Sequence, residues 1–169
     1  MSDEVYLSII QEQEPDFSEQ FCEGVSINDL DNEAIEILKD KYAKKQKNPS
    51  FRSLENYQAL SDLGLIFQGK VTNAAVILVG KKDIINSKYP QAKISLEYRT
   101  GESNIHFDAR EFFDGPYYIM IDKLWAAINS RNGSVPVRNG IYKDYDIPLF
   151  NEDVIREALN NAIAHRAYD

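Results

Sequence analysis

The sequence predicts an α+β fold with a helical N-terminal half, then antiparallel hairpins packed with helices, and an amphipathic helix at the end. Apolar residues recur at helical spacing through the first half, and alternating apolar and polar residues follow after residue 92. A helical pattern returns in residues 151–169. With 169 residues, 43% of them hydrophobic, the chain can bury a core, and this excludes wholesale disorder.

The first half is expected to begin with two helices. Residues 3–14 carry apolar side chains at helical spacing, and Pro15 ends the pattern. A second helix is expected from Asp29 to Gln46, and five lysines lie between positions 39 and 47. These lysines could contact phosphate, but we favour a solvated helix end whose positive charge offsets the helix dipole.

A third helix is expected to start at an N-cap on Ser53 and to end in a left-handed conformation at Gly64. The following Leu65-Ile66-Phe67 and Val71 flank Gln68-Gly69-Lys70, which predicts a tight hairpin. A helix followed by such a hairpin resembles part of a winged helix. Because no basic recognition helix accompanies it, we interpret it as a packing element.

Residues 72–80 are apolar almost throughout, which fits a buried strand as well as a buried helix. Thr72 as an N-cap and the two alanines favour a helix. Gly80-Lys81 invites comparison with a phosphate-binding loop, but the spacing of that motif is absent, so we reject this interpretation.

Two further hairpins are expected. Alternating residues at 92–99 and 105–113 flank a turn at Thr100-Gly101-Glu102, and His106 is expected on the surface of the second strand. Strands at 135–138 and 141–145 flank Asn139-Gly140, a strong two-residue turn signal.

A helix over residues 117–128 is expected between these hairpins, because its apolar residues recur at helical spacing. We assign Trp125 to its core side.

The last helix carries the candidate site. Asn151 is the expected N-cap. Glu157, Asn161 and His165 are spaced i, i+4, i+8, so they form one row along the border of an apolar arc. A carboxylate, a carboxamide and an imidazole at the rim of a core can line a pocket, or they can be half-exposed residues with a structural role. The apolar arc consists of Val154, Ile155, Ala158, Leu159, Ala162 and Ile163.

Composition limits the classes of function. The net charge of −8 and the pI of about 4.8 argue against a nucleic-acid-binding surface on this chain itself. The single cysteine, Cys22, excludes an intrachain disulfide and a cysteine-based zinc site. With no signal peptide and no apolar run of about twenty residues, we expect a cytoplasmic protein without a membrane partner.

Two segments carry a resemblance to a known family: T-N-A-A-V-I-L-V-G-K at 72–81 and R-E-A-L-N-N-A-I-A-H-R-A-Y at 156–168. Together, in this order and at this separation, they resemble a bacterial family of transcriptional regulators, also described as RecG-like helicase-related proteins. In that family a Schlafen/AlbA-type DNA-binding domain precedes a divergent GHKL-type ATPase module. The resemblance is thin from Asp16 and firm from Leu60 to Tyr168. Ala167 departs from the family, which has an aspartate there.

The resemblance implies roles for four residues of the last helix, which corresponds to the helix carrying the N-box of the ATPase. Glu157 matches the general base that polarises the attacking water, and Asn161 matches the ligand of Mg²⁺. The nucleotide would be bound by Asn161, His165 and Arg166.

The resemblance also implies that the chain is a fragment. Residues 1–70 would form a helical packing region after an AlbA-type domain, and residues 71–169 would lead into the first helix of a truncated ATPase. The full-length protein would be a DNA-associated, ATP-binding regulator with ATP and Mg²⁺ as cofactors. DNA would bind through a domain absent from this chain, and neither cofactor would bind tightly to the fragment. No Walker motif is present, so we do not expect strand separation.

The alternative is a non-catalytic interaction or dimerisation module without a nucleotide site. On this view Glu157 and Asn161 are structural, and whether the protein is an enzyme stays open. A free-standing hydrolase using Glu157 and His165 is disfavoured, since neither has a nucleophile or third orienting group nearby in sequence. A truncated helix would expose its apolar arc, so we expect self-association into homo-oligomers through residues 151–169.

Overall fold

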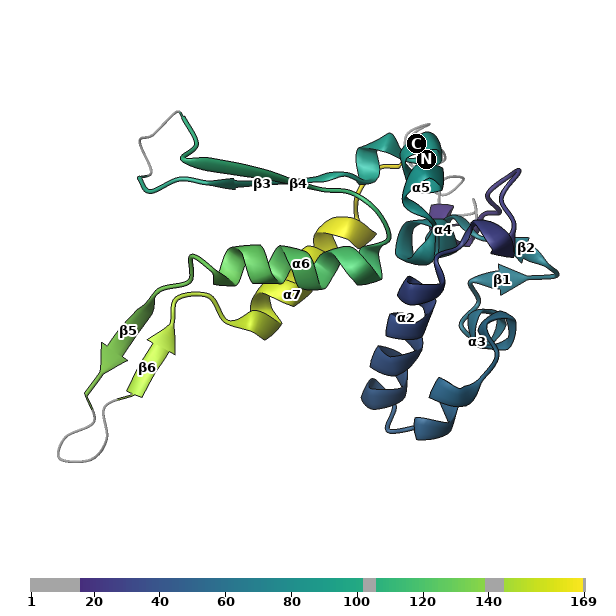
Figure 1. Cartoon of the computed structure of the whole chain (residues 1–169), viewed down its shortest axis with the longest axis horizontal. Coiled ribbons are helices and arrows are strands. Elements are labelled where there is room, and N and C mark those ends of the chain that lie inside the picture. Colours follow the sequence, from purple (N-terminus) through teal and green to yellow (C-terminus); the bar gives the residue numbers. More distant parts are fainter. Residues whose placement is uncertain (1–15, 102–105, 139–144, 169) are drawn as a thin grey trace, which may run out of the picture. The chain divides into compact units, whose positions relative to one another are not determined.

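The expected α+β fold is confirmed by the computed structural model (Figure 1), which describes residues 16–101, 106–138 and 145–168. Helices come first, and antiparallel hairpins with helices follow, as predicted. The helix expected over residues 3–14 lies outside the described residues.

The chain divides into two compact units. The first contains the residues up to Pro90 together with Gly115–Tyr118, and the second contains Gln91–Asp114 together with Ile119–Asp169. One boundary between these compact units therefore falls after residue 90. Residues 71–90 belong with the helical unit because their apolar helix packs into its core.

The first unit is mainly helical. The longest helix among its described residues, α2 (Asn32–Lys45), starts where the Asp31 side chain accepts a hydrogen bond from the Ala34 N–H at 3.0 Å, which satisfies an amide that the helix leaves unpaired. The other elements are η1 (Phe17–Glu19), η2 (Ile27–Asp29), η3 (Pro49–Ser53), α3 (Asn56–Asp62), β1 (Ile66–Phe67), β2 (Lys70–Val71), α4 (Asn73–Val79) and α5 (Lys82–Lys88).

The hairpin after α3 forms as expected. Gln68 and Gly69 have φ of 52° and 76°, and Ile66 pairs with Val71. Positive φ at both central residues gives a two-residue turn the twist that matches its strands. Gly64, with φ of 71°, confirms the left-handed end of α3.

The expected cap of α3 at Ser53 is wrong. Ser53 is the last residue of η3, and α3 begins after Glu55. Pro49 at the start of η3 favours a separate 3₁₀ turn there, because its fixed φ suits the first position of a helix. Ser53, which the sequence pattern had assigned to the start of α3, therefore belongs to that 3₁₀ turn.

Helix α4 confirms the prediction of a buried helix. The Thr72 hydroxyl accepts from the Ala75 N–H at 3.2 Å and donates to the Leu65 carbonyl at 3.1 Å. Val76 and Val79 are fully buried, so α4 runs through the core, where it contacts α2. Leu30, Ile35, Leu60 and Ile85 complete this core.

Of the five lysines near the end of α2, three are exposed, Lys41 is half-buried and Lys39 is buried. Lys44, Lys45 and Lys47 are exposed. Lys39 is only 4% exposed, and its Nζ donates to Glu36 Oε1 at 2.8 Å and to Asn56 Oδ1 at 3.1 Å. A buried ammonium needs such partners because it has lost its hydration. Lys39 therefore joins α2 to the start of α3.

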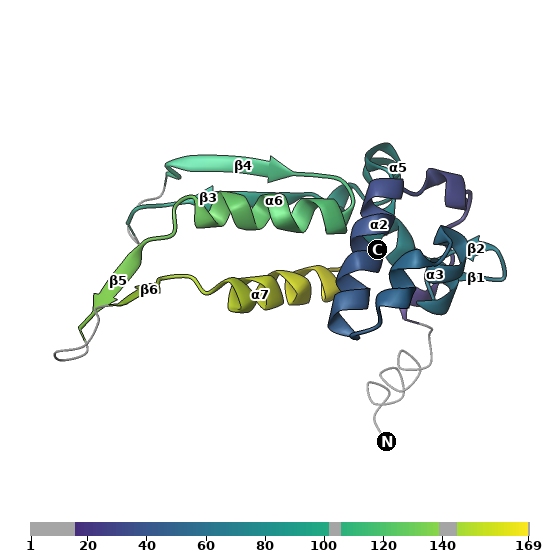
Figure 2. The ribbon, with the colours of Figure 1, turned by 60° about the horizontal axis from the view of Figure 1, so that its bottom comes forward.

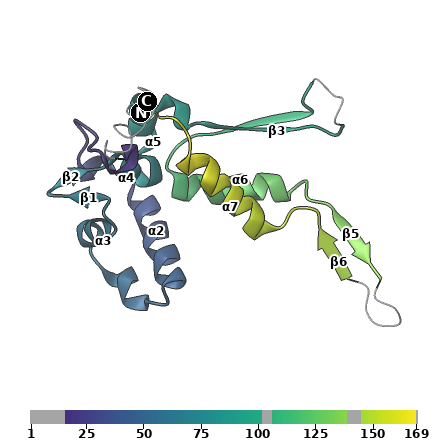
Figure 3. The same cartoon turned by 180° about the vertical axis from the view of Figure 1, so that it is seen from behind.

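In its described residues, the second unit contains two hairpins and two α-helices. Helices α6 and α7 run alongside each other in opposite directions (Figures 1 and 2), and the β5–β6 hairpin extends past their ends (Figure 3). Its elements are η4 (Pro90–Ala92), β3 (Ile94–Tyr98), β4 (Ala109–Phe113), α6 (Tyr117–Asn129), β5 (Ser134–Val137), β6 (Tyr145–Pro148) and α7 (Glu152–Ala164), where Pro90, Tyr117 and Tyr118 group with the first unit.

The β3–β4 hairpin pairs Ile94 with Phe113 and Tyr98 with Ala109. Strand β4 begins at Ala109, whereas the strand was expected over residues 105–113. Residue 105 and part of the expected turn lie outside the described residues. His106 is exposed, as predicted.

Trp125 is only partly buried, so its assignment to the core is too strong. Met120, Ile121 and Leu124 form the buried side of α6.

The β5–β6 hairpin has a register that the sequence did not predict. Val137 pairs with Tyr145, whereas a two-residue turn at Asn139-Gly140 would pair Arg138 with Ile141. The turn itself lies outside the described residues. The described part of the second strand is Tyr145–Pro148, and residues 141–144 of the expected strand lie outside the described residues.

Candidate functional site

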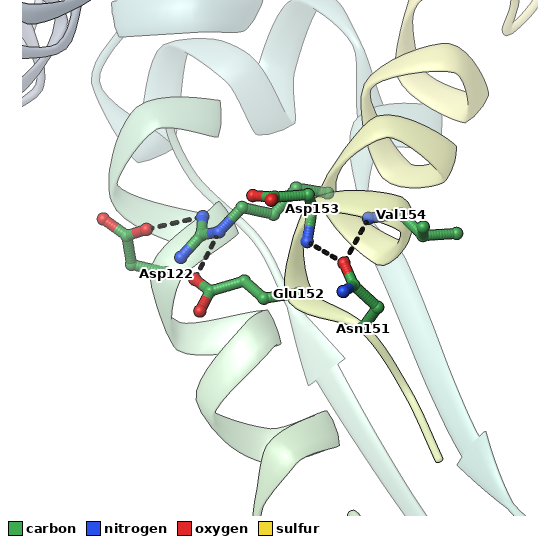
Figure 4. A network of polar contacts seen from close by, with 6 residues as sticks. Asp122, Asn151, Glu152, Asp153 and Val154 are labelled. Carbon is green, nitrogen blue, oxygen red and sulfur yellow. Dashed lines mark hydrogen bonds and ion pairs between the residues drawn. The ribbon is translucent and has the colours of Figure 1, made fainter. Parts of the chain in front are cut away.

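Helix α7 is held at its start by its own sequence. The Asn151 side chain accepts hydrogen bonds from the Asp153 N–H at 2.9 Å and the Val154 N–H at 3.3 Å (Figure 4), which confirms the predicted N-cap. Glu152 and Asp153 place negative charge at the positive end of the helix dipole. The start of the candidate helix is therefore fixed by local interactions.

Arg156 connects α7 to α6. Its Nε donates to Glu152 Oε1 at 2.7 Å, and its Nη1 donates to Asp122 Oδ1 on α6 at 2.8 Å (Figure 4). Burial lowers the pKa of Arg156, but the hydrogen bonds to the two carboxylates more than offset this, so the net change is upward. The guanidinium is thus a fixed cation between the two helices, a role that the sequence analysis missed.

The predicted row of Glu157, Asn161 and His165 lies on the solvent-exposed side of α7. Successive members are one turn apart, about 6 Å along the axis. Among the described residues, the Glu157 and Asn161 side chains form no hydrogen bond or ion pair. Both side chains are therefore open to an external ligand, although the row does not border a buried core as expected.

The predicted apolar arc is only partly covered. Ile163 is buried, and Ile155 and Leu159 are half-buried. Val154 is 64% exposed, and Ala158 and Ala162 are also exposed. The row of Ile155, Leu159 and Ile163 therefore faces the protein. The neighbouring row of Val154, Ala158 and Ala162 faces solvent.

The end of α7 is tied to the residues before β3. Arg166 Nη1 donates to the main-chain carbonyls of Gln91, at 2.5 Å, and Lys93, at 3.2 Å. The Gln91 side chain donates to the Tyr168 carbonyl, and the Tyr168 hydroxyl donates to the Ile163 carbonyl at 3.1 Å. Arg166, predicted to bind a cofactor, therefore already has main-chain acceptors, which supports a structural role.

The donor set of α7 fits only part of a magnesium site. Glu157 and Asn161 offer the oxygen atoms that Mg²⁺ prefers, and Mg²⁺ usually takes its remaining ligands from water and phosphate. Within the described part of the chain, no three or more His, Cys, Asp or Glu side chains are grouped so that they could hold a metal ion. A protein-only metal centre is thus not visible in these residues.

A buried polar network in the first unit was missed by sequence analysis. The Tyr89 hydroxyl donates to Asn73 Oδ1 at 2.6 Å and lies 3.4 Å from Cys22 Sγ, and Asn73 Nδ2 donates to the Phe17 carbonyl at 2.9 Å. Burial, and then the contact with Cys22, raise the pKa of Tyr89. A tyrosine held in its neutral form and bonded to an amide joins segments that are far apart in sequence, so we assign this network to stability. The only signal was an asparagine in the apolar segment 72–80.

The described helices give no indication of a membrane span: none is both long enough and apolar enough to cross a bilayer.

Comparison with known proteins gives a family and a fold. Residues 7–95 match the model of a domain of unknown function (DUF8451). No curated protein matches. Among solved structures, the crystal structure of the DIP2311 protein from Corynebacterium diphtheriae is similar, with a TM-score of 0.72 and 18% identity over 97% of this chain and 31% of that one. At this identity the likeness concerns the fold alone, and the chain spans about a third of the length of that protein.

Proposed function

The chain belongs to the family of a domain of unknown function (DUF8451), and from this premise we propose that it is the middle region of a DNA-associated, ATP-binding regulator of transcription in the cytoplasm. In this proposal the chain links a DNA-binding part to a GHKL-type ATPase part, and α7 is the first helix of the ATPase. The proposal draws on the resemblance of segments 72–81 and 156–168. The greater length of a protein with a similar fold agrees with it.

The observation that carries the proposal is the open pair on α7. Glu157 and Asn161 lie one turn apart on an exposed helix face, and neither side chain has a partner among the described residues. Exposed polar side chains are commonly hydrated without an intramolecular partner, so the specific role of this pair is taken from the resemblance of residues 156–168. The helix is fixed at its start by Asn151 and Arg156 and at its end by Arg166, so the pair is presented on a positioned element.

Each residue of the pair has a role suited to its chemistry. The Glu157 carboxylate would accept a proton from the attacking water. The Asn161 carboxamide oxygen would ligate Mg²⁺, and His165, exposed one turn further on, would contact the nucleotide. Bound Mg²⁺ would supply neutralisation of the phosphate charge.

Calorimetry with Mg²⁺-ATP tests the proposal, on this chain and on the longer natural protein that would contain it. We expect binding by the longer protein only. There Asn161→Ala should abolish binding that depends on Mg²⁺, and Glu157→Gln should retain binding and lower hydrolysis by about 100-fold or more. Asn160→Ala, a change of the same size at the adjacent position outside the row, is the matched control and should change neither. Absence of ATP binding by the longer protein would overturn the proposal.

The second candidate is a non-catalytic interaction module. The observation that favours it is the number of large apolar side chains left exposed on the second unit, among them Val135, Ile147, Leu149 and Val154. The calorimetric experiment separates the two candidates, because this module binds no nucleotide in either form.

A further inference from the structure

The β5–β6 ribbon has one apolar face and an opposite face made of serine, aspartate and two prolines. Directly paired residues of an antiparallel ladder project to the same side, so Val135 with Ile147 and Val137 with Tyr145 share one face. Leu149 continues this face by alternation. The opposite face carries Ser134, Pro136, Asp146 and Pro148.

The apolar face of this ribbon is open to solvent. The exposed fractions are 50% for Val135, 51% for Tyr145, 47% for Ile147 and 61% for Leu149. A ribbon of two strands is at best marginally stable in water when no other element covers its apolar face. A partner that covers this face would therefore stabilise the ribbon as well as bind it.

Both outer edges of the ribbon are unsuited to a further strand. The Leu149 N–H donates to the Gly133 carbonyl at 2.9 Å, and from there the alternation of the ladder places Pro136 and Pro148 at positions that point outward. Proline has no N–H, so each edge lacks a donor that an added strand would need. Association through the face is thus favoured over association through an edge.

The base of the ribbon is positioned by one asparagine. Asn132 Oδ1 accepts from the Phe150 N–H, and Asn132 Nδ2 donates to the Phe150 carbonyl, both at 2.9 Å. These two bonds join the segment after α6 to the segment before α7. The ribbon is therefore held in place before any partner binds, which lowers the entropic cost of association.

We propose that this face packs against the same face of a second copy of the chain, forming a two-fold dimer. This face shares no residue with the proposed nucleotide site. A two-fold contact places one patch on itself, and a patch made only of Val, Ile, Leu and Tyr buries no charge when it does so. The expected self-association is thereby located on the ribbon instead of on residues 151–169.

The exposed area of the apolar face sets the expected affinity of the dimer. Four half-exposed large side chains amount to on the order of 400 Å² on each copy, since a large side chain presents roughly 150–250 Å² when fully exposed. Two copies would bury on the order of 800 Å² of this face, below the roughly 1,200–2,000 Å² typical of stable specific interfaces and within the range of weak, transient ones. We therefore expect a weak dimer, with a dissociation constant in the micromolar range or above.

Charge gives the dimer a distinctive dependence on salt. Each copy carries a net charge of −8, so two copies repel each other at low ionic strength. Salt screens this repulsion and leaves the apolar contact intact. Association should therefore strengthen as salt is raised, whereas binding to a polyanion or a basic partner would weaken.

Analytical ultracentrifugation of the 169-residue chain tests the proposal, over about 5 to 500 µM protein, a range that spans the affinities expected here. We expect a monomer–dimer equilibrium that strengthens with salt. Ile147→Glu should raise the dissociation constant by about tenfold or more, because it places a charge in the apolar face. Ser134→Glu adds the same charge to the opposite face and should leave the constant within about twofold.

A second measurement, crosslinking through introduced cysteines, tests the same contact if Ile147→Glu fails to fold. Since Cys22 is buried, Ile147→Cys introduces one exposed thiol into the apolar face, and Ser134→Cys introduces one into the opposite face. We expect the first to form a disulfide-linked dimer on mild oxidation much faster than the second. A monomer at every concentration, equal effects of both glutamates, or equal rates of crosslinking would overturn the proposal.

Discussion

Replacing Tyr89 by phenylalanine tests whether the buried polar network holds the first unit together. The change removes one hydroxyl and keeps the ring, which packs edge-on against Phe17 with 5.7 Å between centroids. Asn73 Oδ1, in a residue only 5% exposed, loses the donor that lies 2.6 Å away. Leaving a buried acceptor unsatisfied costs about 1–3 kcal/mol, and the retained ring avoids a cavity cost, so we expect the free energy of unfolding to fall by about 2 kcal/mol.

Substitution of Asn73, the hydrogen-bond partner of Tyr89, measures the energetic coupling between the two residues. Asn73→Ala also removes the amide that donates to the Phe17 carbonyl, so we expect a larger loss, about 2–4 kcal/mol. In the double variant with Tyr89→Phe the two losses should fall short of their sum by about 1 kcal/mol, because both remove the same bond.

Urea unfolding followed by far-UV circular dichroism gives these free energies, and hydrogen exchange of amides in α4 assigns them to the first unit. Tyr57→Phe is the control: its side chain is 48% exposed, so we expect a change below about 0.5 kcal/mol. If Tyr89→Phe behaves like Tyr57→Phe, the network contributes no stability and our reasoning is refuted.

The raised pKa of Tyr89 adds a dependence on pH. Below the ordinary tyrosine pKa of about 10 both the folded and the unfolded chain keep the proton, and the stabilisation is complete. Above that pH the unfolded chain loses its proton first, so stability should fall by up to about 1.4 kcal/mol per pH unit. We expect Tyr89→Phe to lose stability less steeply than the parent above pH 10, and parallel curves would contradict this.

Two further predictions concern single positions in each unit. Gly80→Ala should destabilise the first unit by about 2–3 kcal/mol in urea unfolding, because its Cβ would lie 2.4 Å from the Val76 carbonyl oxygen; an unchanged midpoint would show that the backbone can yield there. Arg156→Gln should cost about 0.5–1 kcal/mol, read by Trp125 fluorescence, since the side chain is 27% exposed and joins α7 to α6. Arg52→Gln, in a pair whose arginine is 69% exposed, should cost less; equal effects would argue against the interhelical role.

Local sequence determined those features that depend on neighbours in the chain. The N-cap of α7 at Asn151 and that of α4 at Thr72 could be predicted because each cap bonds amides within three residues of itself. The helix end at Gly64 and the place of Gly69 in the turn could be predicted because positive φ strongly favours glycine, although the predicted turn also included Lys70, which begins β2. The row of Glu157, Asn161 and His165 also followed from helical spacing alone.

The tertiary structure decided which of these residues are covered and by what. Lys39 looks like its solvated neighbours in sequence, and its burial is made tolerable by Glu36 on the same helix together with Asn56 from another helix. The partners Tyr89 and Asn73 are separated by 16 positions, so no local pattern could join them.

Burial of α7 and the register of β5 and β6 were likewise set by distant segments. The pairing of Val137 with Tyr145 followed neither the alternation nor the turn signal, and Val154 stays exposed on an arc that looked inward-facing. The sequence by itself thus determined the N-caps of α4 and α7 and the left-handed end of α3, since those signals are local, whereas the start of α3 differed from its prediction and α5 was not predicted. Tertiary packing determined exposure, register and partners, because each of these depends on surfaces brought together from far along the chain.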